Sequence, residues 1–92
     1  MIERQLTIRN ARGLHARAAA KFVETAEQFS CAIEVSKDDV SVSGSSIMGL
    51  MMLAASKGTS IDVRCDGPDE DKAMDALQAL VTAGFHEDVG AP

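Results

Sequence analysis

One histidine lies where ordinary helix stability does not favour it. His15 follows a loop at residues 10–13 and immediately precedes an alanine-rich segment with helical periodicity, so we expect it at or near a helix N-cap. Ser, Thr, Asp and Asn are the preferred caps, and the positive end of the helix dipole favours acidic side chains. The sequence instead places Arg17 in this first turn. Two departures from the stabilising choice, so close together, indicate a functional site.

Together these groups predict an anion-binding site that contains a nucleophile. The unpaired backbone N–H groups of Ala16, Arg17 and Ala18, the helix dipole and the Arg17 guanidinium would bind an anion such as phosphate. The same positive field disfavours a protonated imidazole, which keeps His15 neutral and nucleophilic at neutral pH. His15 is therefore predicted to accept a phosphoryl group. The alternative is an exposed loop histidine beside a solvated arginine.

A second unusual segment, residues 47–55, is apolar on every side. Its Met and Leu content favours a helix that opens on a serine cap and is closed by Gly58. A two-layer domain of 92 residues cannot bury such a helix completely. The residues expected to face the sheet are Ile47, Leu50, Leu53 and Ala54, and those expected on the surface are Met48, Met51 and Met52.

Exposed methionines form adaptable contact surfaces, so this helix predicts a docking face for protein partners. The alternative is a helix covered by a loop. Ser46 is the natural N-cap, although Ser45 competes for that position. A phosphate on Ser46 would lie at a favourable helix N-terminus but within an apolar docking surface. Such a modification is expected to spare the fold and to weaken binding.

The second histidine and both cysteines have structural interpretations. His86 is expected in the last turn of the third helix, where a cation suits the dipole, and the residues after it are expected to fray. Cys31 and Cys65 have neither CxxC nor zinc spacing, which favours two small hydrophobic residues in a reducing compartment. No catalytic cluster and no glycine-rich phosphate loop is present, so no metal, organic cofactor or conventional enzyme activity is predicted.

Seven elements are expected to position these residues. Alternating apolar residues predict strands within 1–9, 31–36, 40–42 and 61–65. Helical periodicity predicts helices over 16–29, over 47–55 and from the Gly-Pro-Asp sequence at 67–69 to about residue 86. The order β-α-β-β-α-β-α indicates a single α+β domain over residues 1–92, with the helices on one face of the sheet and water on the other.

Composition excludes several classes of protein. A net charge of -5 and an aromatic content of 3% argue against nucleic-acid binding, which needs basic surfaces and stacking platforms. No apolar stretch approaches the roughly 20 residues of a membrane span, and the first residues carry no basic-then-apolar signal pattern. We therefore expect a cytoplasmic protein without membrane contact.

Two segments of the chain resemble the HPr family of phosphocarriers: GLHAR at residues 13–17 and SIMGLMML at residues 46–53. The resemblance covers nearly the whole chain, including the order of the elements and the spacing of about thirty residues between the two motifs. It implies an open-faced sandwich, in which three helices cover one face of a four-stranded antiparallel sheet of order 1-4-2-3.

The resemblance also implies roles for individual residues. His15 matches the histidine that the family phosphorylates on Nδ1, and Arg17 matches the arginine that stabilises the phosphoryl group. The amides of Ala16 and Arg17 match backbone donors to that group. Ser46 matches the serine that an ATP-dependent kinase/phosphorylase modifies in many bacterial members. The residues expected to contact partners are Ile47, Met48, Met51, Met52, Ala20 and Lys21.

Members of the family accept phosphoryl from phospho-Enzyme I, which phosphoenolpyruvate charges, and pass it to a histidine of a IIA protein or domain. The chain would thus be a stoichiometric carrier, monomeric and without turnover of its own. It departs from the family pattern at Ala18, where Pro is usual, and at Arg12, where Asn or Ser is common. The HARAAAKF sequence at residues 15–22 looks like members of regulatory or nitrogen-related branches. One alternative to a carrier for sugar uptake is thus a regulatory binding module. Another is an unphosphorylated structural adaptor, in which the placement of His15 and Arg17 would be accidental.

Overall fold

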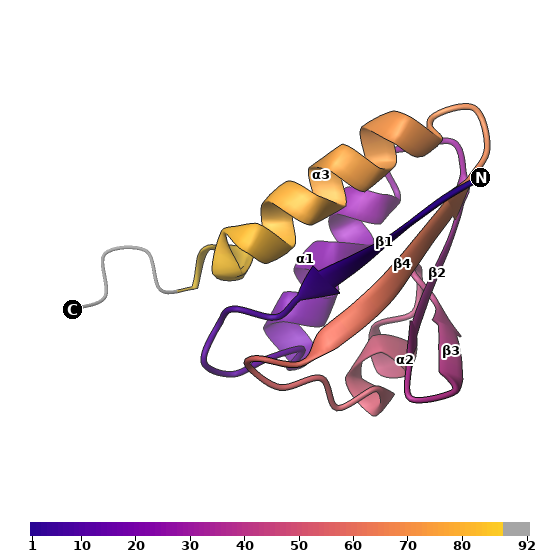
Figure 1. Cartoon of the computed structure of the whole chain (residues 1–92). Helices are drawn as coiled ribbons and strands as arrows, with labels where there is room; N and C mark the ends of the chain where they lie inside the picture. Colours follow the sequence, from indigo (N-terminus) through magenta and orange to yellow (C-terminus); the bar gives the residue numbers. More distant parts are fainter. Residues whose placement is uncertain (88–92) are drawn as a thin grey trace.

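The computed structural model describes residues 1–87 of the chain. Four strands, β1 (Ile2–Thr7), β2 (Ala32–Lys37), β3 (Val40–Ser43) and β4 (Ser60–Asp66), form one antiparallel sheet in the order β1-β4-β2-β3. The helices α1 (Ala16–Ala26), α2 (Ile47–Met52) and α3 (Glu70–Thr82) lie on one face of it, and a short 3-10 turn, η1 (Gly84–His86), follows α3 (Figure 1). The predicted class, element order and strand order are confirmed.

The core lies between the sheet and the helices. The sequence pattern determines which face of the sheet and which side of each helix are buried in it. Apolar side chains that alternate along the strands point toward the helices. The helices bury one stripe each, with residues three or four positions apart. The strand residues that are fully buried include Val35, Ile61, Val63 and Cys65, and the helix residues include Phe22, Ala73, Met74 and Leu77.

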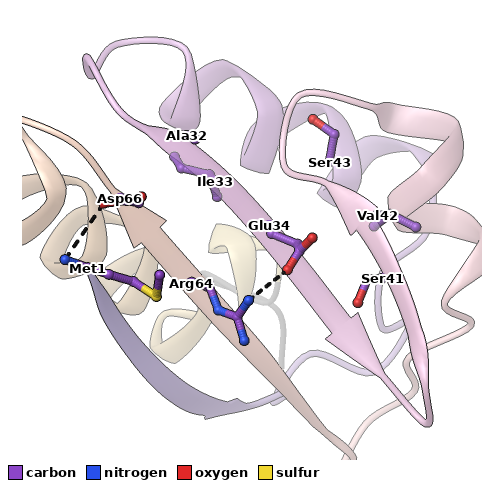
Figure 2. A pocket seen from close by; sticks show the side chains of 9 residues that line it. All are labelled: Met1, Ala32, Ile33, Glu34, Ser41, Val42, Ser43, Arg64 and Asp66. Atoms are coloured by element: carbon purple, nitrogen blue, oxygen red, sulfur yellow. Dashed lines mark hydrogen bonds and ion pairs between the residues drawn. The ribbon is translucent and has the colours of Figure 1, made fainter.

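The other face of the sheet is solvated, as the alternation predicts. Arg64 on β4 pairs there with Glu3 on β1 and Glu34 on β2, each at 3.3 Å. Figure 2 shows Arg64 beside Glu34 in a shallow hollow of about 460 Å³ that lies over β2, β3 and β4. The three side chains are about half exposed, and surface pairs of this kind contribute little to stability.

All three helices end earlier than their periodicity predicts. Helix α1 ends at Ala26, and the next residues tighten into i→i+3 turns that leave Phe29 half-buried beyond the helix. Helix α2 ends at Met52 because Ala54 takes a left-handed backbone (φ 51°) as the chain turns toward β4, so Gly58 does not close it. Helix α3 ends at Thr82, which places His86 outside it. Within residues 1–87, no helix is both long enough and apolar enough to cross a membrane.

Candidate functional site

His15 is the N-cap of α1, in extended backbone (φ -80°, ψ -179°). Its ring nitrogen Nδ1 accepts a hydrogen bond from the backbone N–H of Arg17, at 3.3 Å. Its carbonyl accepts the first helical bond, from Ala19 N at 2.8 Å. The Arg17 N–H is therefore not unpaired, contrary to the prediction, because the imidazole itself fills the capping role. The bond also shows that Nδ1 presents a lone pair toward the positive end of the helix.

The loop before His15 is held rigidly. Gly13 has a left-handed backbone (φ +65°), and a Cβ there would collide with the carbonyl oxygen of Ala55. Leu14 is buried and donates its N–H to the same oxygen at 2.9 Å. Asn10 is completely buried, and its side-chain amide donates to Gly13 O at 2.8 Å. This loop therefore positions His15 and attaches it to the segment that follows α2.

Glu87 is a member of the site that the sequence analysis missed. Its carboxylate contacts Nε2 of His15 through Oε2, and its Oε1 accepts a hydrogen bond from the side-chain amide of Asn10 at 3.0 Å. Only 11% of the Glu87 side chain is exposed. The prediction that the chain frays after His86 is wrong for Glu87, while residues 88–92 lie outside the described residues. Because the contact joins positions 72 residues apart, no local pattern could have indicated it.

The ionisation of Glu87 fits these contacts. Burial, the largest influence, raises the pKa of the carboxyl, but the hydrogen bonds from Asn10 and His15 and the nearby Lys21 charge together hold it below its ordinary value. Glu87 is therefore ionised at neutral pH. A carboxylate beside Nε2 and a helix N-terminus beside Nδ1 give the two edges of the ring opposite electrostatic surroundings.

His15 opens into a cavity of about 360 Å³ with a strongly basic lining. The residues that line it are Ala11, Arg12, His15, Arg17, Lys21, His86 and Glu87. A phosphoryl group fits a site of this charge. The interpretation of His86 as a helix-capping cation is wrong, because His86 lies in η1 and joins the lining. Lys21 also lines the cavity and donates its Nζ to the carbonyl of Phe85 at 2.7 Å, and its expected contact with partners stays a prediction.

The N-cap of α2 is Ser46 and not Ser45. Its hydroxyl oxygen accepts a hydrogen bond from Gly49 N at 2.9 Å. Around it lies a predominantly apolar surface: Met48 and Met52 are 70% and 74% exposed, and Ile47 and Met51 are partly exposed as well. The prediction that Ile47 and Ala54 face the sheet is wrong, whereas Leu50 and Leu53 are buried. On the neighbouring helix α1, Ala20 is half-buried.

The two cysteines pack in or against the core, in agreement with the prediction that they are small hydrophobic residues. Cys65 is fully buried, and burial raises its pKa to about 11, so the thiol is protonated and unreactive at neutral pH. Cys31 is half-buried. Among residues 1–87, no three His, Cys, Asp or Glu side chains converge to hold a metal ion.

Comparisons with known proteins agree with this architecture. Residues 2–83 match the family described as PTS HPr component phosphorylation site. The chain is 52% identical over 87 residues to the phosphocarrier protein HPr of Neisseria meningitidis, which covers 95% of this chain and 98% of the relative. It is 43% identical to the phosphocarrier protein NPr of Shewanella violacea, with 94% of each chain covered.

A solved structure of HPr from Thermoanaerobacter tengcongensis superimposes with a TM-score of 0.90 at 45% identity, over 95% of this chain and 98% of that one. The family match over residues 2–83 spans the sheet, all three helices and the loop that carries His15. The chain therefore belongs to the HPr family of phosphocarrier proteins of the phosphotransferase system.

Proposed function

We propose that this chain carries a phosphoryl group on Nδ1 of His15, accepts it from phospho-Enzyme I and passes it to a histidine of a IIA protein. The geometry of His15 is the main support. Nδ1 presents its lone pair at a helix N-terminus, beside a cavity lined by Arg12 and Arg17. A lone pair is what a nucleophile needs, and the basic lining is what the transferred group needs.

The transfer follows from these positions. The Nδ1 lone pair attacks the phosphorus atom, and the electron pair of the breaking N–P bond returns to the donor histidine. Once Nδ1 is bonded to phosphorus it no longer accepts the Arg17 N–H, which then donates to a phosphoryl oxygen. The Ala16 N–H and the Arg17 guanidinium would stabilise the same group. The chain supplies position and charge, and is regenerated only when the phosphoryl group leaves.

The partners are expected to bind over α2. The exposed methionines Met48, Met51 and Met52 and the neighbouring Ile47 offer an adaptable apolar contact beside a basic site. A partner with an apolar centre and an acidic rim complements this surface, and fast exchange between partners requires a modest interface. We expect the carrier to act as a cytoplasmic monomer, and phosphorylation of Ser46 to weaken partner binding.

The test is phosphorylation by phosphoenolpyruvate and purified Enzyme I, followed by intact mass and phosphorus NMR. We expect one acid-labile phosphoryl group on the wild-type chain and none on His15→Ala. Circular dichroism of His15→Ala should match that of the wild type, which excludes unfolding as the cause. Labelling that persists in His15→Ala, or a wild-type chain that stays unlabelled beside an active control carrier, would refute the assignment.

A regulatory role is the second candidate, favoured by the relative described as NPr. In this case the phosphorylation state of His15 or Ser46 would control binding to regulators rather than sugar uptake. The phosphorylated chain would be offered separately to IIA proteins of sugar permeases and to IIA proteins of nitrogen-related regulation. Faster transfer to the first group supports carriage for uptake, and faster transfer to the second supports regulation.

A further inference from the structure

The turn that delivers Glu87 to His15 has an unusual backbone. Gly84, Phe85 and His86 take consecutive left-handed conformations, with φ of 64°, 55° and 60°. This region suits glycine but is disfavoured for residues with a Cβ, and such conformations persist only where surrounding contacts impose them. Here Phe85 is completely buried, and its carbonyl accepts the hydrogen bond from Lys21. The fold thus maintains a strained turn whose result is to bring Glu87 back over the N-terminus of α1.

A continuous chain of hydrogen bonds runs from Asn10 through Glu87, the residue after the turn, to the imidazole of His15. The buried amide of Asn10 donates to Glu87 Oε1, and the other carboxylate oxygen contacts His15 Nε2. On the opposite edge of the ring, the Arg17 N–H donates to Nδ1. A carboxylate accepts protons and a backbone N–H donates one. The two contacts therefore place the ring proton on Nε2 and leave the lone pair on Nδ1.

We propose that Glu87 is a positioning residue for phosphoryl transfer, which orients the His15 ring, fixes its proton on Nε2 and offsets the charge that the ring acquires. The proposal rests on the proposed function, in which Nδ1 is the acceptor. Carboxylates that receive the second N–H of a histidine serve other functional imidazoles in this way.

The charge balance of the transfer explains why a carboxylate is useful at this position. When Nδ1 uses its lone pair to bond phosphorus, the ring keeps its Nε2 proton and acquires a positive charge. The groups that face it from the cavity lining are Arg12, Arg17, Lys21, His86 and Glu87. The positive charges of Arg12, Arg17 and Lys21 favour the phosphoryl oxygens but disfavour a cationic ring. Among these described residues, only the carboxylate of Glu87 favours a cationic ring.

The best variant to test this role is Glu87→Gln, because Asn10 determines how the new amide lies. Asn10 donates to the oxygen at the Oε1 position, so the glutamine oxygen is retained there and the NH2 group faces His15. Flipping Asn10 instead would remove the donor to Gly13 O. The NH2 group donates to Nε2 and thereby favours the ring proton on Nδ1, where it displaces the hydrogen bond from the Arg17 N–H and blocks the nucleophile. In Glu87→Ala, water can replace the carboxylate and accept the Nε2 proton.

The experiment measures two quantities in wild type, Glu87→Gln, Glu87→Ala and the control Glu24→Gln, which changes an exposed glutamate of α1. The first is the tautomer of His15, from nitrogen-15 shifts of the unphosphorylated chain at a pH where the ring is neutral. The second is the rate of phosphorylation by phospho-Enzyme I at saturating chain concentration. We expect the Nε2–H tautomer in wild type and Glu24→Gln, and its depletion in Glu87→Gln.

The rate should fall by about 10- to 100-fold in Glu87→Ala, the range typical for partners that orient a functional imidazole, and further in Glu87→Gln. An unchanged tautomer and rate in Glu87→Gln would overturn the proposal. So would a slower rate without a tautomer change, or a tautomer change without a slower rate. If the wild type takes no phosphoryl group on His15, the proposed function fails, whereas the tautomer measurement still tests the contact itself.

Discussion

Helices α1 and α2 both begin with a side chain that caps the helix, and what surrounds each cap differs. Ser46 makes a 2.9 Å hydrogen bond to Gly49 N, within a surface of exposed methionines. His15 makes a longer bond, 3.3 Å, to Arg17 N, with basic side chains and a carboxylate around it. At α2 the cap stabilises the helix end, and at α1 the cap is the histidine proposed to carry the phosphoryl group.

The comparison shows that a helix N-terminus alone does not specify chemistry. Both ends present N–H groups and a positive dipole, yet only α1 adds an imidazole, a basic cavity and a partner for the second ring nitrogen. Helix α2 adds an adaptable apolar surface instead. Since Leu14 donates its N–H to Ala55 O, the loop that carries His15 is bonded to the segment that follows α2.

The largest effect expected from a change near either cap is that of Arg17→Ala. Removing a preorganised positive group from a site of charge transfer typically slows the reaction about 10²- to 10³-fold. We expect this loss in the rate of phosphorylation by phospho-Enzyme I, measured by quenched time courses. Arg64→Ala removes the same charge from the solvated face of the sheet, where Arg64 pairs with Glu3 and Glu34, and should leave the rate unchanged. Equal slowing in both variants would attribute the effect to net charge rather than to the site.

A smaller effect is expected at the other cap, for Ser46→Asp. The added charge lies in the apolar docking surface, and we expect about tenfold less efficient phosphorylation, equivalent to about 1.4 kcal/mol of partner binding. Thermal stability should stay near that of wild type, because aspartate caps a helix as well as serine. Ser45→Asp adds the same charge at an exposed neighbour that is not the cap. If Enzyme I phosphorylates Ser46→Asp as efficiently as wild type, the docking role of this surface is wrong.

The sequence alone predicts the starts of α1 and α2 better than the turn after α3. His15, Arg17 and Ser46 were predicted because their signals are local: a residue type at a helix start is read from its neighbours. The strands were predicted because alternation determines which face is buried. The end of α2 was not, since residues 47–55 are apolar on every side and periodicity cannot say where such a helix stops. Tertiary structure ends it, through the turn at Ala54.

The carboxylate of the site was missed for a different reason. Glu87 reaches His15 only because three successive residues take left-handed backbone, and two of them, Phe85 and His86, are not glycine. No propensity predicts such a turn, since it opposes the intrinsic preference of both residues. Burial of Phe85 imposes it. The same turn explains why the position of His86 was predicted wrongly, because the helical periodicity of the sequence continues past Thr82, where α3 ends.

The smallest effect is expected for Ser46→Ala, which tests the helix-capping role of Ser46 apart from its role in docking. Ser46→Ala removes the acceptor of the Gly49 N–H and should lower the free energy of unfolding by about 1 kcal/mol, as measured by urea denaturation. Ser45→Ala removes an exposed hydroxyl and should stay within about 0.5 kcal/mol of wild type. Equal losses would mean that the two serines share the cap. Because Ser46→Ala adds no charge, Enzyme I should phosphorylate it like wild type, so that alanine lowers stability without affecting docking and aspartate does the reverse.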